Sequence, residues 1–125
     1  MNQYENIRKN AELVVKVFAE NDGVELDFDE SSVEWLDGYI ERNRENFDEE
    51  TVRGLVNVLG SFLGECICRN YGGNWSQDEN GLTVKFDELN GVYPFNKIEK
   101  HFINGAEDSI LSFYQTIPVV FGLNK

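Results

Sequence analysis

The sequence predicts an α+β fold in a single domain, residues 1–125, with about five helices and a small antiparallel β-hairpin or three-stranded sheet inserted after the third helix. Two patterns lead to this prediction. Apolar residues recur at steps of three and four over most of the chain, which is typical of amphipathic helices. Between residues 74 and 86 the period changes to two, the period of strands, around an Asn-Gly pair typical of hairpin turns. A chain of this length with 41% apolar residues can bury a core of its own.

The first helix is expected over residues 2–22 and ends at Gly23. An extended segment, 24–28, follows, in which apolar and acidic side chains alternate, so that its apolar side chains turn inward. The apolar stripe of the helix consists of Tyr4, Ile7, Ala11, Val14, Val15 and Phe18, and the inward side chains of the extended segment are Val24, Leu26 and Phe28.

The second helix begins at a cap formed by Asp29 or Ser31 and reaches Arg44 or Asn46. Its apolar residues lie on one face of the helix. That face consists of Val33, Leu36, Tyr39 and Ile40, with Trp35 near its edge.

The third helix has an unusually wide apolar face and is therefore expected to lie at the centre of the fold, covered on more than one side. Asp48 is its N-cap, and it ends at the pair Gly72-Gly73. Gly60 and Gly64 form a G-x-x-x-G step, which inside a soluble core indicates that a neighbouring element packs closely against them. The wide apolar face consists of Val52, Leu55, Val56, Leu59, Phe62, Leu63, Cys66 and Ile67.

The C-terminal part combines strands with two shorter helices. Residues 74–86 form the hairpin, with its turn at Asn80-Gly81, and residues 91–95 form a third short strand or an extended link. A helix then starts at Pro94 and closes at Asn104-Gly105. The last helix covers about residues 106–116, Pro118 prevents its continuation, and residues 119–121 form an extended tail.

Acidic residues are concentrated in the first part of the chain. Residues 1–50 carry 15 acidic against 5 basic side chains, whereas residues 51–125 carry 8 against 6, within a formal net charge of −12. Most of these acids lie between Glu20 and Glu50, and their field repels nucleic acids and anionic membranes but attracts basic proteins and cations. The sequence therefore predicts no nucleic-acid or membrane partner. Two interpretations of the acids stay open: a solvated surface that keeps the protein soluble, or a docking surface for a basic protein.

The two cysteines are expected to be reduced thiols. Cys66 and Cys68 are two residues apart on a helix, so their side chains point about 200° apart and cannot form a disulfide. A C-x-C pair with the lone histidine, His101, is not a zinc ligand set. The segment that begins at Asp27 starts like a calcium-binding loop but lacks the glycine and the closing glutamate of such a loop. We therefore expect no bound metal and no cofactor.

The cellular location is expected to be cytoplasmic. No apolar run in the sequence approaches the roughly 20 residues that a membrane-spanning helix needs. The N-terminal residues lack both the positive start and the apolar block of a signal peptide.

Three motifs resemble those of a loose group of small bacterial cytoplasmic proteins without assigned function. A glycine-containing helix ends at Gly72-Gly73-x-Trp75, and a P-F-x-K helix begins at Pro94. An N-G-x-x-D-S-x-x-x-F-Y helix then begins at Asn104. The resemblance covers about residues 48–115. It implies an α+β fold and a bacterial cytoplasmic origin, and it carries no catalytic residue.

No set of residues is spaced as a catalytic constellation, so the sequence favours a non-enzymatic role and assigns no catalytic residue. His101, Asp108 and Ser109 flank the expected Asn104-Gly105 turn, but their spacing does not show whether they meet. Glu65 lies on the apolar central helix. If Glu65 is buried it requires a partner, such as Arg69 one turn later.

A ligand pocket where the central helix passes to the sheet is the alternative function. Trp75 directly follows the paired glycines and is either a core anchor or one wall of such a pocket. The site would serve a small-molecule binder or a modest hydrolase. The residues proposed for this pocket are Glu65, Tyr71, Trp75, Tyr93 and His101.

The favoured function is a non-catalytic protein-interaction module, such as an adaptor, an inhibitor or an immunity-type protein, that presents an acidic face within residues 20–50 to a basic partner. We expect a monomer or a weak homodimer, in which self-association would use the apolar tail at Val119, Val120 and Phe121. The residues proposed for the acidic face are Asp27, Asp29, Glu30 and Glu34.

Overall fold

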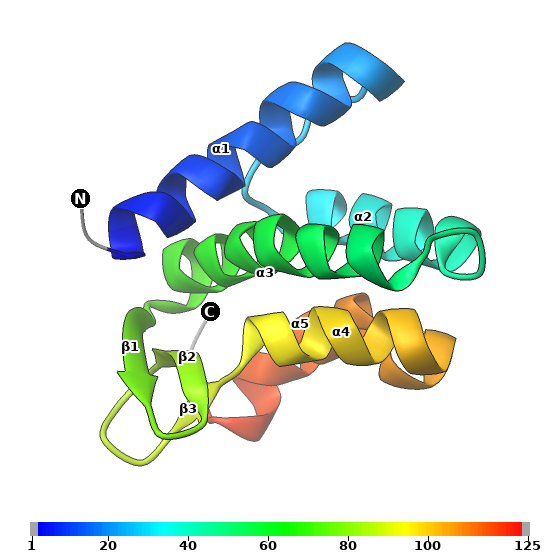
Figure 1. Ribbon diagram of the computed structural model, residues 1–125. Helices are drawn as coiled ribbons and strands as arrows, with labels where there is room; N and C mark the ends of the chain where they lie inside the picture. The colour runs from blue at the N-terminus through cyan, green and yellow to red at the C-terminus, as the bar shows by residue number, and fades with distance from the viewer. Residues whose placement is uncertain (1–2, 124–125) are drawn as a thin grey trace.

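A computed structural model describes residues 3–123 and confirms the predicted α+β fold (Figure 1). Five α-helices surround the core, and a three-stranded antiparallel sheet in the order β1-β2-β3 follows the third helix. The elements are α1 (Gln3–Asp22), α2 (Glu30–Asn43), α3 (Glu49–Tyr71), β1 (Asn74–Asp78), β2 (Gly81–Lys85), β3 (Gly91–Val92), α4 (Pro94–Asn104), the 3₁₀ helix η1 (Gly105–Asp108) and α5 (Ile110–Val120).

The centre of the fold is α3, as the width of its apolar face predicted. In Figure 1 it runs between α1 above and α4 below, and the sheet lies beyond its C-terminal end. The most extensive contacts between helices are those of α3 with α1 and with α4. Every residue of α3 from 59 to 67 is buried, so the helix is covered on several sides rather than on one stripe.

The two glycines of the G-x-x-x-G step receive aromatic rings. A Cβ at Gly64 would overlap the ring of Trp75 from β1, and a Cβ at Gly60 would overlap the ring of Phe95 from α4. These two rings touch each other, with centroids 5.8 Å apart. The close approach predicted from the step is therefore present, but flat side chains rather than a helix backbone fill the space.

By length and composition alone, α3 could also cross a membrane. Among the residues that the structure describes, it is the helix that meets both criteria, with a mean hydropathy of 1.2 in its most apolar window, whereas the sequence analysis expected no apolar run of that length. Half of that window is buried inside the molecule. The core helix of a soluble protein meets the same criteria, and the rings packed on Gly60 and Gly64 fit that explanation.

The hairpin forms where the sequence predicted it, with Trp75 opposite Val84. The residue that takes a positive φ is Gly81, at +116°, and no non-glycine residue among those described has a positive φ. Asn80 therefore does not adopt the left-handed conformation that an Asn-Gly turn of type I′ requires. The third strand, β3, is short and pairs with β2.

The C-terminal prediction was wrong in its boundaries. Residues 105–108 form η1, and α5 starts only after its N-cap Ser109 and continues through Pro118 to Val120. Pro118 lies in the last turn, where its missing N–H removes a single backbone hydrogen bond. The next bonds still form, from the Phe121 N–H to the Ile117 carbonyl at 3.1 Å and from Leu123 to Pro118 at 2.8 Å.

Candidate functional site

Apart from Glu45, Glu49 and Glu50, around the start of α3, the acidic residues between positions 20 and 50 fall into two groups, and the side chains of the first group form hydrogen bonds within the fold. Asp29 caps α2, where its Oδ1 accepts the Ser32 backbone N–H at 3.0 Å. Glu30 accepts a hydrogen bond from the Gln115 side chain of α5 at 3.2 Å. Asp48 caps α3 by accepting the Thr51 N–H at 2.8 Å. Two residues of the predicted acidic face, Asp29 and Glu30, therefore have structural partners inside the chain.

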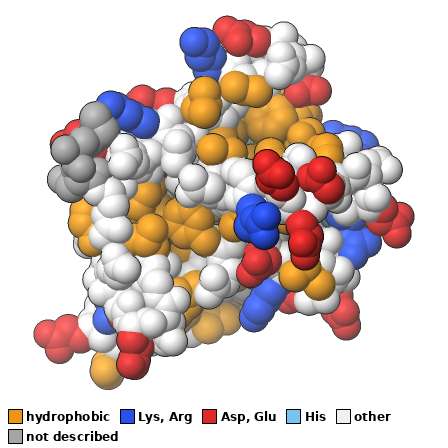
Figure 2. Space-filling view, viewed as in Figure 1, with side chains coloured by type: hydrophobic (Ala, Val, Ile, Leu, Met, Phe, Trp, Pro, Cys, Tyr) orange, Lys and Arg blue, Asp and Glu red, His pale blue; other side chains and the backbone are white. Residues whose placement is uncertain are grey.

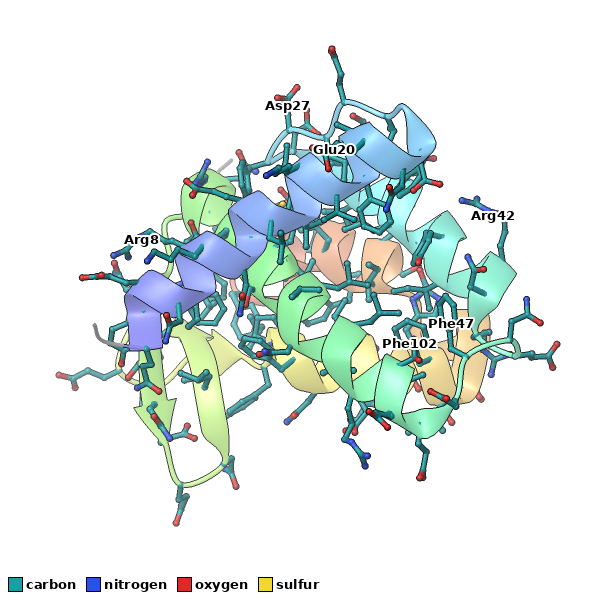
Figure 3. The ribbon with its side chains drawn as sticks, turned by 45° about the horizontal axis from the view of Figure 1, so that its top comes forward. Arg8, Glu20, Asp27, Arg42, Phe47 and Phe102 are labelled. Carbon is teal, nitrogen blue, oxygen red and sulfur yellow. The ribbon has the colours of Figure 1, made fainter. Side chains whose placement is uncertain are left out.

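The second group forms what we call the acidic cluster. Its five side chains are exposed and make no hydrogen bond or ion pair with other residues in the described part of the chain. They lie at the C-terminal end of α1, in the link to α2 and on the first turns of α2, and Figure 3 shows Glu20 on α1 and Asp27 in the link that follows it. The acidic cluster consists of Glu20, Asp22, Glu25, Asp27 and Glu34.

An apolar groove adjoins the acidic cluster. It lies between the C-terminal half of α1 and the N-terminal half of α3 and has a volume of about 170 Å³. Figure 2 shows hydrophobic side chains gathered between these two helices. Leu13 contributes a large exposed apolar surface, 45% of its maximum. Asp22 belongs both to the groove and to the acidic cluster. We call this feature the α1–α3 groove, lined by Leu13, Val14, Val17, Phe18, Asn21, Asp22, Tyr39, Leu55 and Val58.

Aromatic side chains support the α2 side of the groove. The Phe18 ring meets the rings of Tyr39 and Trp35 edge to face, with centroids 4.8 Å and 5.0 Å apart. Burial raises the pKa of Tyr39, the carboxylate of Asp22 raises this pKa further, and Arg42 opposes the increase. The charge of Asp22 therefore acts inside the groove. The sequence analysis missed this site; the signal for it was the pair Leu13 and Val17, four residues apart and outside the core stripe of α1.

The structure brings together only two of the five residues proposed for a ligand pocket. The Trp75 Nε1–H donates to Glu65 Oε2 at 2.9 Å, and Glu65 Oε1 accepts from Arg69 at 3.2 Å, the partner expected from the sequence. Tyr71 instead packs against the ring of Tyr114. The other two residues also have partners elsewhere: Tyr93 donates to Asp78 at 2.6 Å, and His101 contacts α2 and α5.

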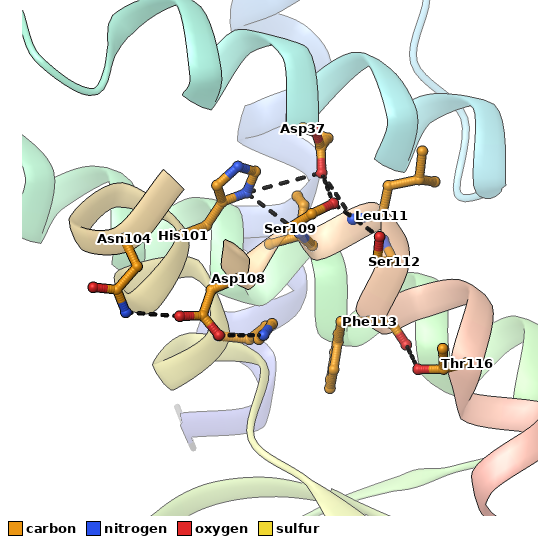
Figure 4. Close-up of polar contacts among 11 residues, drawn as sticks. Asp37, His101, Asn104, Asp108, Ser109, Leu111, Ser112, Phe113 and Thr116 are labelled. Carbon is orange, nitrogen blue, oxygen red and sulfur yellow. Dashed lines mark hydrogen bonds and ion pairs between the residues drawn. The ribbon is translucent and has the colours of Figure 1, made fainter. Parts of the chain in front are cut away.

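His101 belongs to a network that caps α5 (Figure 4). Its Nδ1 accepts the backbone N–H of Ile110 at 3.3 Å, and its Nε2 lies 3.0 Å from Glu41 Oε1. These two contacts fit the neutral imidazole with its proton on Nε2. Asp37 Oδ2 lies 3.9 Å from Nδ1 and accepts the N–H of Leu111 at 3.0 Å.

Ser109 completes this cap. Its Oγ donates to Asp37 Oδ2 at 2.5 Å and accepts the N–H of Ser112 at 3.2 Å. The first three backbone N–H groups of α5, which no helical carbonyl can satisfy, thus each have a side-chain acceptor. Asp108 is bound elsewhere, to Lys97 at 2.9 Å and Asn104 at 2.7 Å. His101 and Ser109 therefore each accept a backbone N–H of α5 rather than bonding to each other.

Four surface cavities in the described residues can be compared with the predicted pocket. Of four surface cavities in the part of the chain that the structure describes, none is lined by Glu65, Trp75 or His101. Tyr93 lines a separate cavity of about 250 Å³. The largest of the four, about 420 Å³, is lined mainly by polar side chains: Gln3, Asn6, Ile7, Lys9, Asn10, Asn57, Leu82 and Phe95.

Both cysteines are free, and their burial suppresses thiolate formation. Cys66 is fully buried, and burial raises its pKa far above the ordinary value for a thiol. Burial also raises the pKa of Cys68, to about 12. Because the thiolate is the reactive and metal-binding form, these side chains act as core residues at neutral pH.

No family model, curated protein or solved structure matches the chain. Its function must therefore be inferred from the acidic cluster and the α1–α3 groove.

The capping role of Asp29 predicts a pH-dependent stability. The Ser32 backbone N–H, as the largest cause, holds the pKa of Asp29 below the ordinary 3.8. The capping stabilisation is thus complete above pH 3.8 and is lost as the pH falls through the lower native pKa. We expect Asp29→Ala to lower the free energy of unfolding by about 1 kcal/mol at neutral pH.

This deficit should shrink in denaturant titrations below pH 3.8, because the wild-type carboxyl is then protonated. Asp27→Ala is the control, since the Asp27 side chain is exposed and caps no helix. A deficit of the same size at every pH would contradict the assigned cap.

Proposed function

We propose that this chain is a non-catalytic protein-interaction module that binds a basic protein through the acidic cluster and the adjoining α1–α3 groove. The observation that carries the proposal is that the two features meet at Asp22: this residue is one of five exposed carboxylates without partners in the described chain, and it also lines the exposed apolar groove. Protein interfaces commonly combine an apolar centre with a polar or charged rim. A surface that served solubility alone would not need the groove.

The division of the acids supports the same proposal. Asp29, Glu30 and Asp48 are used within the fold, as are Asp37 and Glu41 of the α5 cap. The side chains of the acidic cluster form no such hydrogen bonds. No interaction inside the described chain therefore offsets the repulsion among their charges. A partner with clustered Lys or Arg side chains would relieve that repulsion and would be attracted at long range.

The absence of free catalytic groups in the described residues argues for binding over catalysis. His101 has no exposed surface, and both of its ring nitrogens are engaged. Ser109 donates its proton to Asp37 and accepts from Ser112, so its hydroxyl is fully used by the cap of α5. Neither side chain is presented to a substrate.

The proposal is tested by neutralising the acidic cluster. The variant carries Glu20→Gln, Asp22→Asn, Glu25→Gln, Asp27→Asn and Glu34→Gln. A matched control removes five exposed carboxylates that lie elsewhere, so both variants change the net charge equally. The control substitutions are Glu12→Gln, Glu79→Gln, Glu88→Gln, Glu99→Gln and Glu107→Gln.

Tagged wild type, variant and control are used to capture proteins from a lysate of the source organism, and the captured proteins are identified by mass spectrometry. We expect wild type and control to retain a basic protein that moderately high salt releases. The variant should bind that protein roughly ten- to a hundredfold more weakly, because each exposed charge pair contributes about 0.2–1 kcal/mol. Equal retention by the variant and the control would refute the proposal.

A further inference from the structure

We infer that the α1–α3 groove receives an amphipathic α-helix of the partner, which seats apolar side chains between α1 and α3 and places Lys or Arg side chains beside Asp22 and the rest of the acidic cluster. This inference rests on the proposed function and specifies its partner. It follows from the size of the groove, from a glycine of α3 next to its lining residues, and from the charge of Asp22 within it.

The dimensions of the groove suit side chains of a helix better than a small molecule. Its volume of about 170 Å³ lies below the roughly 300–1,000 Å³ of typical ligand pockets. Its α1 wall extends from Leu13 to Asp22, about 13 Å at the helical rise of 1.5 Å per residue. That length matches between two and three turns of a docked helix, the usual footprint of an apolar helix face in a groove.

Gly54 is not one of the lining residues, but it leaves α3 without a side chain next to two residues that are. It lies one turn before Val58 and next to Leu55, both of which line the groove. A Cβ at Gly54 would meet nothing within 4 Å, unlike those at Gly60 and Gly64. A glycine inside a helix costs about 1 kcal/mol relative to alanine, and the packing of the free chain does not explain that cost here. Bare backbone at this position permits a partner helix to approach closely.

The charge around the groove selects the occupant. A second copy of the chain would also carry a net charge of −12 and would bring like charges together at Asp22. A helix with an apolar ridge and flanking Lys or Arg side chains instead complements both the Leu13 side of the groove and its acidic end. The occupant is therefore a basic amphipathic helix of a different protein.

The test selects binders from a displayed library of helical peptides. Each peptide has an alanine-rich framework in which the other positions carry randomised residues. Selection uses the folded wild-type protein, with counter-selection against Gly54→Trp, which places a large ring on α3 one turn before Val58. We expect enriched peptides to carry apolar residues at i, i+3 or i+4, and i+7 and to have a net positive charge. One enriched peptide is then synthesised with a fluorescent label, and its affinity is measured by anisotropy.

We expect Gly54→Trp and Leu13→Ser each to reduce the affinity for that peptide at least tenfold. Both sites are exposed, and circular dichroism should show the wild-type fold. Three results would overturn the inference. The enriched peptides could lack the apolar period, they could bind Gly54→Trp as well as wild type, or no peptide could be enriched. A wild-type dimer in sedimentation experiments that Gly54→Trp abolishes would also overturn it, because a second copy would then occupy the groove.

The same measurements separate this inference from the proposed function. Basic peptides that lack the apolar period and are lost when the acidic cluster is neutralised would overturn the helix but leave charge-based docking in place. Amphipathic peptides that bind the groove equally well after neutralisation would support the groove and refute the need for a basic partner.

Discussion

Gly64→Ala is expected to destabilise the protein by about 1 to 3 kcal/mol, although alanine is the better helix former by about 1 kcal/mol. The reason is the ring of Trp75, which occupies the space that the new Cβ needs. To make room, the indole must move, which disturbs both its hydrogen bond to Glu65 and its contact with Phe95. The free energy of unfolding from a denaturant titration measures the effect.

Gly54→Ala is the matched control on the same helix. Nothing lies within 4 Å of the added Cβ, so only helix propensity changes, and stability should rise by about 0.5–1 kcal/mol. The two variants should thus shift the unfolding midpoint in opposite directions. A smaller ring in the variant Trp75→Phe should recover part of the loss in the Gly64→Ala background. Stabilisation by Gly64→Ala would show that the indole does not pack on this glycine.

His101→Phe is expected to lower the free energy of unfolding by about 3 kcal/mol. The substitution keeps an aromatic ring, but it leaves the buried Ile110 N–H without an acceptor. It also removes the hydrogen bond to a charged group, Glu41. The ring is fully buried, so water cannot replace the lost acceptor. Denaturant titration gives the size of the loss, and the exchange rate of the Ile110 amide locates it. We expect that exchange to accelerate.

Ser109→Ala provides the comparison within the same cap. It removes the acceptor for Ser112 at the more exposed N-cap position, and we expect a loss of about 1 kcal/mol. The losses of the two single variants should not add in the double variant, because Asp37 contacts both side chains. A His101→Phe protein as stable as wild type would show that the histidine does not cap α5 and would return it to the candidates for a catalytic role.

The total charge of this chain says little about how its acids are used. Glu30 and Glu34 are one turn apart on α2 and look equivalent in the sequence, yet Glu30 binds Gln115 and Glu34 is exposed without a partner in the described chain. Neutralising Asp29 together with its neighbours, as the sequence would suggest, would damage the start of α2 as well as any docking surface. The acidic cluster defined from the structure separates these two effects.

The sequence by itself determined the elements whose signals are local. The α3 cap at Asp48, an α2 cap at either Asp29 or Ser31, the end of α3 at Gly72 and the hairpin all depend on residues within a few positions of one another. The wide apolar face likewise identified α3 as the central helix. Hydrophobic periodicity and capping are short-range physical effects, so they can be read directly along the chain.

Only the tertiary structure decided which distant residues share a site. Asp37 caps α5 across 74 positions, and Glu41 meets His101 across 60, and no periodic pattern links such pairs. The α1–α3 groove likewise requires the packing of three helices, and of the residues proposed for a pocket Trp75 bonds to Glu65 whereas Tyr93 bonds to Asp78. These outcomes depend on the angles at which helices pack, and those angles are set by the fit of the whole core rather than by any one segment.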